Sequence, residues 1–156
     1  MPPHLHGLGR STTLANSPSP PYKLEDQVGH LLRRANQRHA AIFFEGLGAK
    51  QLTPLQFAVL VKIGDEGEVS QNLLGRLTAM DPATVQGVVR RLRERKLIDA
   101  RPAPEDRRRS LWKLSPAGAQ FIGDVIPTAQ AITVKTLEPL SAKEQKALLD
   151  MLRKLS

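Results

Sequence analysis

Residues 70–114 decide the fold, and they read SQNLLGRLTAMDPATVQGVVRRLRERKLIDARPAPEDRRRSLWKL. Near the middle, Asp81 and Pro82 have the features of a helix start, because aspartate caps free backbone N–H groups and proline is tolerated at the first helical position. Apolar residues follow with the i, i+3, i+4, i+7 spacing of one buried helix face. They are Val85, Val88, Val89 and Leu92. The sequence therefore predicts a helix that begins at Pro82 and buries one side.

The other side of this helix is polar and cationic, which is the kind of surface that the major groove of DNA accepts. The residues predicted to face DNA are Thr84, Gln86, Gly87, Arg90, Arg91 and Arg95. A shorter helix, capped by Ser70 and ending at Leu77, precedes it across the short link 78–80. The two helices and their link have the layout of a helix-turn-helix.

Two short strands are predicted after this unit, at residues 97–101 and 110–114. The segment 102–109 between them contains two prolines and a run of charges, which favours an exposed hairpin loop over a core strand. The predicted fold class is therefore mainly α with a small β-hairpin wing, that is, a winged helix-turn-helix.

With these features the chain resembles the MarR family of transcription regulators. Asp106 and Arg108 match the Asp-x-Arg pattern of the family's wing. The resemblance covers residues 24–155 and implies a winged helix-turn-helix domain plus a helical dimerisation lobe. The residues that carry it are Thr84-Val85, Arg91-Leu92, Leu97-Ile98, Asp106-Arg107-Arg108 and Leu114-Ser115-Pro116-Ala117-Gly118.

The chain departs from the family pattern at two positions. Gly87 stands where the family often has arginine; it costs the helix about 1 kcal/mol relative to alanine and lets the backbone approach DNA closely. Lys96 stands where the family often has glycine, so we expect Lys96 to adopt the left-handed conformation that glycine takes easily.

Composition and charge agree with a DNA-binding protein of one domain or one two-lobed protomer. The net charge is +8, and residues 70–114 hold 11 lysines and arginines against 5 acidic residues, which suits a polyanionic partner. The alternative is a merely solvated basic face.

The absence of cysteine excludes disulfides, thiolate catalysis and cysteine-based metal sites. Without an apolar run of transmembrane length or a signal peptide, we expect a cytoplasmic protein with no membrane partner.

The chain divides into four predicted parts. Residues 1–21 are expected to be a disordered N-terminal arm, in which His4 and His6 are a weak metal-binding pattern; an arm ordered against a dimer partner is the alternative. Residues 22–50 form a dimerisation helix, 51–114 the DNA-binding domain and 115–156 the C-terminal dimerisation helices.

Pro127 is expected to kink the long helix that begins after Ser115, or to start a new one. The terminal helices carry more apolar surface than one protomer covers, which predicts a homodimer.

A two-fold dimer would place its recognition helices about 34 Å apart and would read an inverted-repeat operator in double-stranded DNA. Thr84, Gln86 and Arg90 are candidates for base contacts, whereas Arg91 and Arg95 suit phosphates or an ion pair with Glu94. In the wing, Arg108 is the candidate for the minor groove, and Asp106 is expected to order the wing by pairing with an arginine. The basic wing residues are Arg107, Arg108 and Arg109.

The resemblance also implies release from DNA when a small aromatic acid or phenol binds where the first helix meets the DNA-binding lobe. An arginine or histidine beside an aromatic wall would suit a ring that carries a carboxylate. His39 could instead be a core or interface histidine, and Arg34 and Arg38 could be solvated or pair across a dimer. The candidate ligand-binding residues are His30, Arg34, Arg38, His39, Phe43 and Phe57.

Other function classes fit the sequence less well. No nucleophile-elbow, Walker, zinc-protease or complete dinucleotide-binding motif is present, so we expect neither an enzyme nor a cofactor. A nonspecific or architectural DNA-binding protein without a small-molecule ligand is the main alternative, and a protein-interaction module is another. The uncharged start of the recognition helix favours base reading, and the basic wing argues against the interaction module. A protein without an obvious polymerase-contacting domain is expected to act as a repressor.

Overall fold

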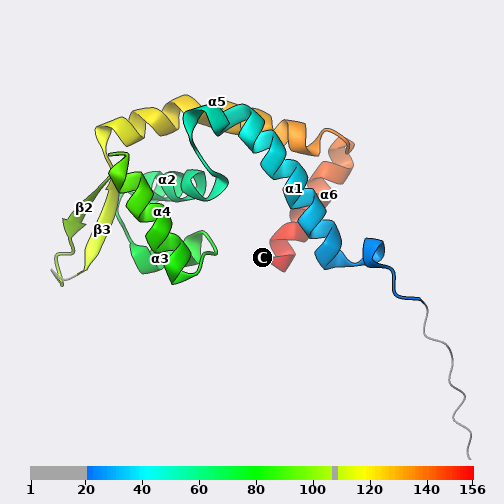
Figure 1. Ribbon diagram of the computed structural model, residues 1–156, viewed down its shortest axis with the longest axis horizontal. Coiled ribbons are helices and arrows are strands. Elements are labelled where there is room, and N and C mark those ends of the chain that lie inside the picture. Colours follow the sequence, from blue (N-terminus) through cyan, green and yellow to red (C-terminus); the bar gives the residue numbers. More distant parts are fainter. Residues whose placement is uncertain (1–20, 107–108) are drawn as a thin grey trace, which may run out of the picture.

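The computed structural model describes residues 21–106 and 109–156. The α2–α4 region and the small sheet form one lobe, α1 and α6 lie at the opposite end, and α5 runs between the two (Figure 1). The elements in chain order are η1 (Leu24–Asp26), α1 (Val28–Leu47), η2 (Gly48–Lys50), α2 (Pro54–Glu66), β1 (Val69–Ser70), α3 (Gln71–Leu77), α4 (Pro82–Glu94), β2 (Ile98–Pro102), β3 (Ser110–Leu114), α5 (Pro116–Leu137) and α6 (Ala142–Leu155). The predicted fold class, mainly helical with a winged helix-turn-helix, is confirmed.

The predicted helix starts are confirmed by their caps. The Asp81 carboxylate accepts a hydrogen bond from the Thr84 backbone N–H at 2.9 Å, and Pro82 occupies the first turn of α4. Ser70 caps α3 in the same way, and Ser115 caps α5. These side chains satisfy backbone donors that the first helical turn leaves free, which is why short polar residues define the starts so sharply.

The wing is part of a three-stranded antiparallel sheet with the order β1-β3-β2. Trp112, in the central strand, pairs with Val69 on one side and Ala100 on the other. The two-residue strand β1 was not predicted, since so short a segment has no recognisable periodicity. It fixes the base of the wing against the start of α3.

The helix α5 decides between the two alternatives expected at Pro127. It continues through Pro127 to Leu137, so the alternative in which Pro127 starts a new helix is wrong. Figure 1 shows α5 as one arched helix that packs along α1. The two helices approach closely at Gly46, where an added Cβ would lie 3.0 Å from Cδ1 of Ile132. We infer that this packing keeps α5 in one piece, although proline removes one backbone hydrogen bond.

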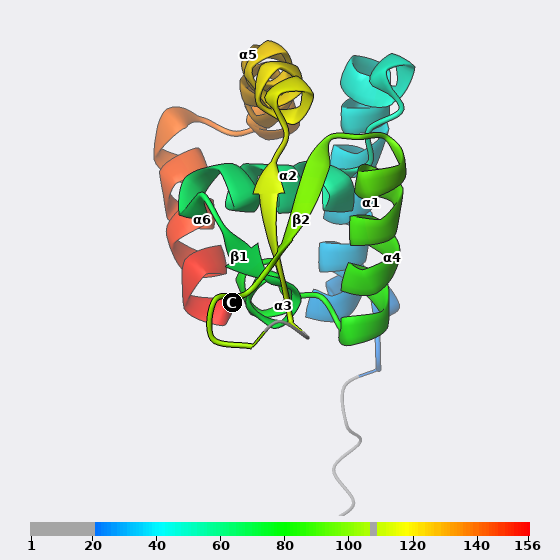
Figure 2. The same cartoon turned by 90° about the vertical axis from the view of Figure 1, so that its left-hand side faces the viewer.

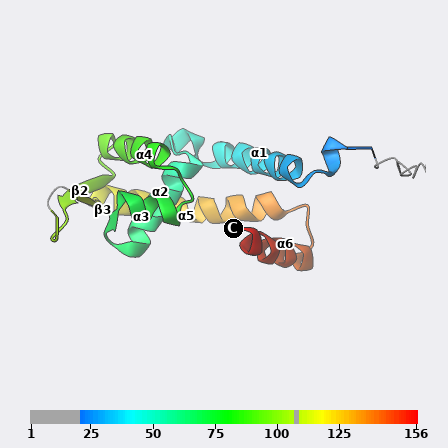
Figure 3. The same ribbon diagram turned by 90° about the horizontal axis from the view of Figure 1, so that it is seen from below.

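Two ends of the chain keep apolar faces that the protomer does not cover. None of the residues of α6 is buried, and Leu155 is 74% exposed. On α1, Val28 is 67% exposed, whereas Phe43 near the other end of the helix is 3% exposed. The chain turns back at the end of α5 to form α6 (Figure 3). None of the described helices is long and apolar enough to span a membrane.

The end of α4 lies against the start of α5 in a tight junction. Lys96 has a φ of 58°, the left-handed conformation predicted for it. The Ser115 hydroxyl donates to the Lys96 carbonyl at 2.7 Å, and the Ser115 N–H donates to the Leu97 carbonyl at 3.1 Å. At Gly118 the two backbones lie so close that an added Cβ would be 1.9 Å from the Leu97 oxygen. Only glycine fits at this position without a shift of the backbone.

The junction gives a prediction about stability. Gly118→Ala should lower the free energy of unfolding by about 2 kcal/mol or more, because the new methyl group overlaps the Leu97 carbonyl. Gly123→Ala, in the same helix with nothing within 4 Å of the added Cβ, is the matched control. The control should be stabilised by up to about 1 kcal/mol. Urea unfolding at one fixed protomer concentration measures both, and equal stability of the two variants would contradict the prediction.

Candidate functional site

The helix α4 has two sharply different sides. The apolar residues predicted for its buried face are 0–2% exposed. On the opposite side Gln86, Arg90 and Arg91 are exposed, and Thr84 and Gly87 are half-buried. Arg90 lies 3.8 Å from Glu94 in an exposed ion pair, which contributes little stability and leaves the side chain available. The burial of one side thus turns a defined set of polar and cationic groups outward.

The outward side of α4 has a shallow hollow at Gly87, which has no side chain. Ala83, Gln86, Gly87 and Arg90 line a shallow hollow of about 320 Å³. An added Cβ at Gly87 would meet nothing nearer than Nη2 of Arg91 at 4.0 Å. Glycine is therefore not required by packing, and its effect is to leave the helix backbone accessible from outside.

Thr84 has a second role besides the one predicted. Its hydroxyl donates to the Asp81 carboxylate at 2.5 Å, and these hydrogen bonds hold the pKa of Asp81 below its ordinary value. The hydroxyl oxygen keeps its accepting capacity, while its proton is used in the cap.

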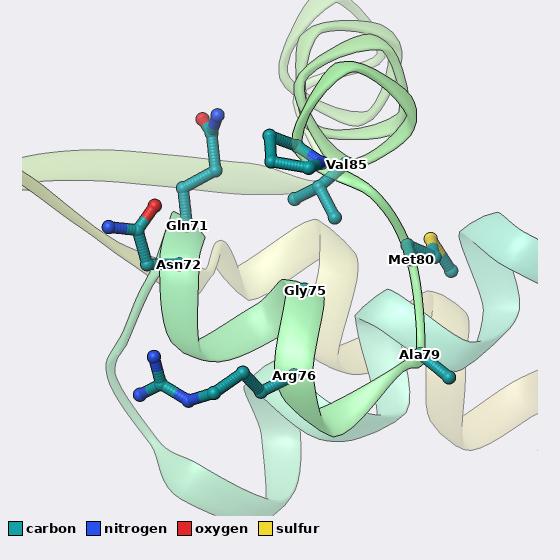
Figure 4. A pocket seen from close by; sticks show the side chains of 8 residues that line it. Gln71, Asn72, Gly75, Arg76, Ala79, Met80 and Val85 are labelled. Carbon is teal, nitrogen blue, oxygen red and sulfur yellow. The ribbon is translucent and has the colours of Figure 1, made fainter.

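A second hollow, which the sequence did not predict, lies between α3 and the start of α4. Its volume is about 490 Å³, and the polar groups of Gln71, Asn72 and Arg76 stand around it (Figure 4). Pro82 and Val85 of α4 line its other side. In a helix-turn-helix the first helix crosses the DNA backbone, so these donors belong to the same candidate interface. The polar face of α3 was the signal that could have identified them.

Arg95 differs from its prediction as a residue facing DNA. Its guanidinium donates to the backbone carbonyl of Gln51 at 2.7 Å and to that of Lys50 at 3.0 Å. The same group lies 5.3 Å from the centroid of the Phe121 ring. Arg95 is therefore directed toward η2 and α5 and is engaged in contacts within the protomer, so we remove it from the candidate DNA contacts.

The wing, formed by β2 and β3, extends beside α4 (Figure 2). It lies at the end of the molecule remote from α6 (Figure 1). Its base is held by Arg101 of β2, whose guanidinium forms a two-fold hydrogen-bonded ion pair with Glu68, just before β1. This hydrogen bonding lowers the pKa of Glu68 below its ordinary value, against a smaller opposing effect of burial. The pair joins the end of β2, next to the predicted loop, to the turn that precedes the helix-turn-helix.

The tip of the wing is described only in part. The Arg109 N–H donates to the Asp106 carbonyl at 2.9 Å, and the Ala103 N–H donates to the Arg109 carbonyl at 2.8 Å, so the hairpin is closed by its backbone. Arg109 is exposed and Asp106 is half-buried. Arg107 and Arg108 lie outside the described residues, as do residues 1–20 of the predicted N-terminal arm with His4 and His6.

Three of the predicted ligand-binding residues form a row between α1 and α2. The rings of His39 and Phe43 have centroids 6.3 Å apart, and those of Phe43 and Phe57 are 6.0 Å apart in an edge-to-face arrangement. Nδ1 of His39 lies 3.1 Å from the Thr136 hydroxyl of α5. An imidazole at the end of an aromatic row is thus held at the contact between α1 and α5.

The other three predicted ligand-binding residues are arranged differently. Arg38 donates to the carbonyls of Lys135 and Thr136, at 3.1 Å and 3.4 Å, near the end of α5. His30 is paired with Arg33 at 3.1 Å and lies nine residues before His39 on α1, about 13 Å along the helix. Arg34 is exposed. Arg38 and His39 therefore both contact Thr136 of α5, whereas His30 lies apart from the aromatic row.

Comparisons with known proteins agree with this geometry. The MarR family model matches residues 50–109. The transcriptional repressor NicR of Pseudomonas putida is 41% identical over 150 residues, which cover 95% of each chain. A probable transcriptional regulator from Pseudomonas aeruginosa is 48% identical, with a TM-score of 0.83 over 86% of this chain and all of that one.

For a third relative, the small molecule that regulates its DNA binding is known. BpsR of Bordetella bronchiseptica, whose DNA binding is regulated by 6-hydroxynicotinic acid, is 43% identical, with a TM-score of 0.84 over 87% of this chain and 97% of that chain. These relatives are regulators rather than enzymes. The match to NicR spans nearly the whole of both proteins, well beyond the DNA-binding domain. By its sequence and its fold, this chain belongs to the MarR family of transcription regulators.

Proposed function

We propose that the protein is a homodimeric repressor that binds an inverted-repeat operator in double-stranded DNA and releases it when a small aromatic acid binds. The observation that carries this proposal is the two-sided helix α4, whose apolar side is 0–2% exposed while Gln86, Arg90 and Arg91 point outward beside the wing. The cytoplasm is the compartment in which such a regulator would meet its operator.

The outward groups of α4 have the chemistry of base and phosphate contacts. Gln86 suits the paired donor and acceptor of adenine, and Arg90 suits the two acceptors of guanine. Arg91, and Gln71, Asn72 and Arg76 on α3, suit phosphates, which position the protein without reading sequence. The proposed wing contacts are Arg107, Arg108 and Arg109, with Asp106 ordering the hairpin, and Thr84 and Gly87 complete the surface.

The uncovered faces of α1 and α6 support the homodimer. Residues such as Val28 and Leu155 are more than half exposed, and burying them against a second copy would remove apolar surface from water. A two-fold axis at this end would leave the two α4 helices free to enter successive major grooves, about 34 Å apart.

The effector that we propose is a hydroxylated pyridine carboxylate. The support is the similarity to BpsR, which is regulated by 6-hydroxynicotinic acid, together with the aromatic row His39, Phe43 and Phe57. The imidazole of His39 and the guanidinium of Arg38 both contact Thr136, and together they could bind a carboxylate beside this row. Ligand binding there would alter the contact between α1 and α5. His30 and Arg34 are not part of this site in the present structure, and they would contact the ligand only after such a rearrangement.

The alternative is a nonspecific or architectural DNA-binding protein without a small-molecule ligand. Such a protein would bind operator and unrelated duplex equally. The uncharged residues at the start of α4 speak for base reading, since phosphate binding alone requires only cations.

The proposed function predicts that the effector weakens operator binding. A duplex selected by the protein from genomic fragments is titrated in fluorescence anisotropy, with and without 6-hydroxynicotinic acid. The affinity should fall at least about fivefold, the usual lower range of such coupling. Sodium acetate at the same concentration, which adds the same ionic strength without an aromatic ring, is the control. A ligand that binds by calorimetry but leaves the affinity unchanged contradicts the regulatory part, and equal affinity for unrelated duplex contradicts the operator.

The ion pair between Glu68 and Arg101 gives a prediction in which the direction of the change in operator affinity is diagnostic. Removing an acidic charge near DNA should by itself tighten binding, because it lowers the repulsion of phosphates. If Glu68 holds the wing through Arg101, Glu68→Gln should instead weaken operator binding, by about threefold.

Glu66→Gln is the matched control for this prediction. Glu66 is an exposed glutamate two positions earlier, with no ion pair among the described residues, and its substitution makes the same change of charge. The control should bind the operator as tightly as the wild type or slightly more tightly. Anisotropy at one fixed salt concentration compares the variants, and tighter binding by Glu68→Gln would contradict the assigned role.

A further inference from the structure

We propose that Arg95 is a positioning residue for DNA recognition: it sets the tilt of α4 on the dimerisation lobe and thereby the half-site spacing that the dimer accepts. The inference rests on the proposed function, because spacing has meaning only for a dimer on an inverted repeat. It gives Arg95 a role that differs from the phosphate contact expected from its sequence position.

One guanidinium joins three segments that lie far apart in the sequence. Arg95 is the C-cap of α4. Its two terminal nitrogens donate to the carbonyls of Lys50 and Gln51, at the end of the turn η2 that continues α1. Its guanidinium carbon lies over the ring of Phe121 on α5, 5.3 Å from the ring centroid. The end of the recognition helix is thus tied to both helices that lead into the dimerisation lobe.

The partners of Arg95 are held in place, so the contact transmits position. Gln51 adopts the left-handed conformation, with a φ of 51°, and its N–H donates to the Gly48 carbonyl at 2.8 Å. The carbonyls at a helical C-terminus carry partial negative charge and lack partners within the helix, which makes them strong acceptors for a cation. Arginine suits this position better than lysine, because it offers two donors in a fixed fork and a flat face for an aromatic ring.

The contact lies at the end of α4 that faces the dimerisation lobe. The chain leaves α4 through Lys96 and Leu97, whose carbonyls accept hydrogen bonds from Ser115 at the start of α5. The other end of α4 follows the short link 78–80 after α3. A change at Arg95 therefore acts on α4 as a tilt about its C-terminal end.

The geometry of the helix amplifies such a tilt. With 13 residues, α4 is about 20 Å long. A tilt of about 10° at Arg95 would move the far end of α4 by roughly 3.5 Å, which is about the rise of one base pair, and Thr84 and Gln86 by roughly 2–3 Å. Holding the tilt therefore favours one half-site spacing over spacings that differ from it by one base pair.

The test compares operator duplexes whose half-sites stand at the preferred spacing, one base pair closer and one base pair farther apart. Affinities are measured by fluorescence anisotropy as a function of salt for the wild type, Arg95→Met and Arg95→Lys. Arg91→Met, an exposed arginine on the same helix, is the comparison for a phosphate contact. Methionine keeps an unbranched chain while removing the charge and the donors.

The expected results separate positioning from DNA contact. The wild type should prefer the correct spacing by about tenfold or more, and Arg95→Met should reduce this preference to about threefold or less. Its salt dependence should stay that of the wild type, and Arg95→Lys should recover part of the preference. Arg91→Met should keep the spacing preference and lose about 0.9 from the salt slope for each phosphate contact removed.

Two results would overturn the inference: an Arg95→Met variant with the spacing preference of the wild type, or one with the reduced salt slope of Arg91→Met. If circular dichroism shows that Arg95→Met does not fold, Phe121→Leu replaces it. This variant removes the aromatic ring beside Arg95 and should also reduce the preference for the correct spacing. An unchanged spacing preference in Phe121→Leu would then overturn the inference. A wild-type protein that binds no inverted repeat refutes the proposed function itself, before any variant is made.

Discussion

The burial of one side of α4 is the constraint on which the rest of the structure depends. Val85 and Leu92 cannot stay buried unless the helix keeps one rotation about its axis, and that rotation turns Gln86, Arg90 and Arg91 outward. The core therefore decides which residues can reach a partner. The hydrophobic effect is nondirectional, yet here it orients a polar surface, because the apolar and polar positions alternate with the helical period.

A second constraint fixes where this surface stands relative to the rest of the chain. The backbone around Lys96 and Leu97 is hydrogen-bonded to Ser115, and Gly118 lets the first turn of α5 lie directly against it. The side chain of Arg95 adds a contact to the end of η2. Events at the contact between α1 and α5, where His39 meets Thr136, can therefore reach the recognition helix through packed elements rather than through a flexible linker.

The sequence predicted the features that depend on near neighbours in the chain. The cap at Asp81 and the buried face of α4 follow from residue types a few positions apart, and the left-handed Lys96 follows from the family resemblance; all three are confirmed. Features that depend on distant residues were missed. Arg95 looks like any other arginine of α4, since its partners lie 44 and 45 residues earlier. The sequence left two alternatives at Pro127 and could not choose the continuous α5, since the packing of α5 on α1 joins residues far apart in the chain. The pair of Glu68 with Arg101 likewise joins residues 33 positions apart.

The central claim is that two copies present two α4 surfaces to one duplex. It can be tested by measuring the molar mass of the protein–DNA complex. Light scattering coupled to size-exclusion chromatography gives the mass of the protein alone, on an inverted-repeat duplex and on a single half-site. The account predicts a dimer in solution and two chains per intact duplex, with no stable complex of one chain on a half-site. A monomer in solution, or one chain bound as tightly to a half-site as to the full operator, would contradict it.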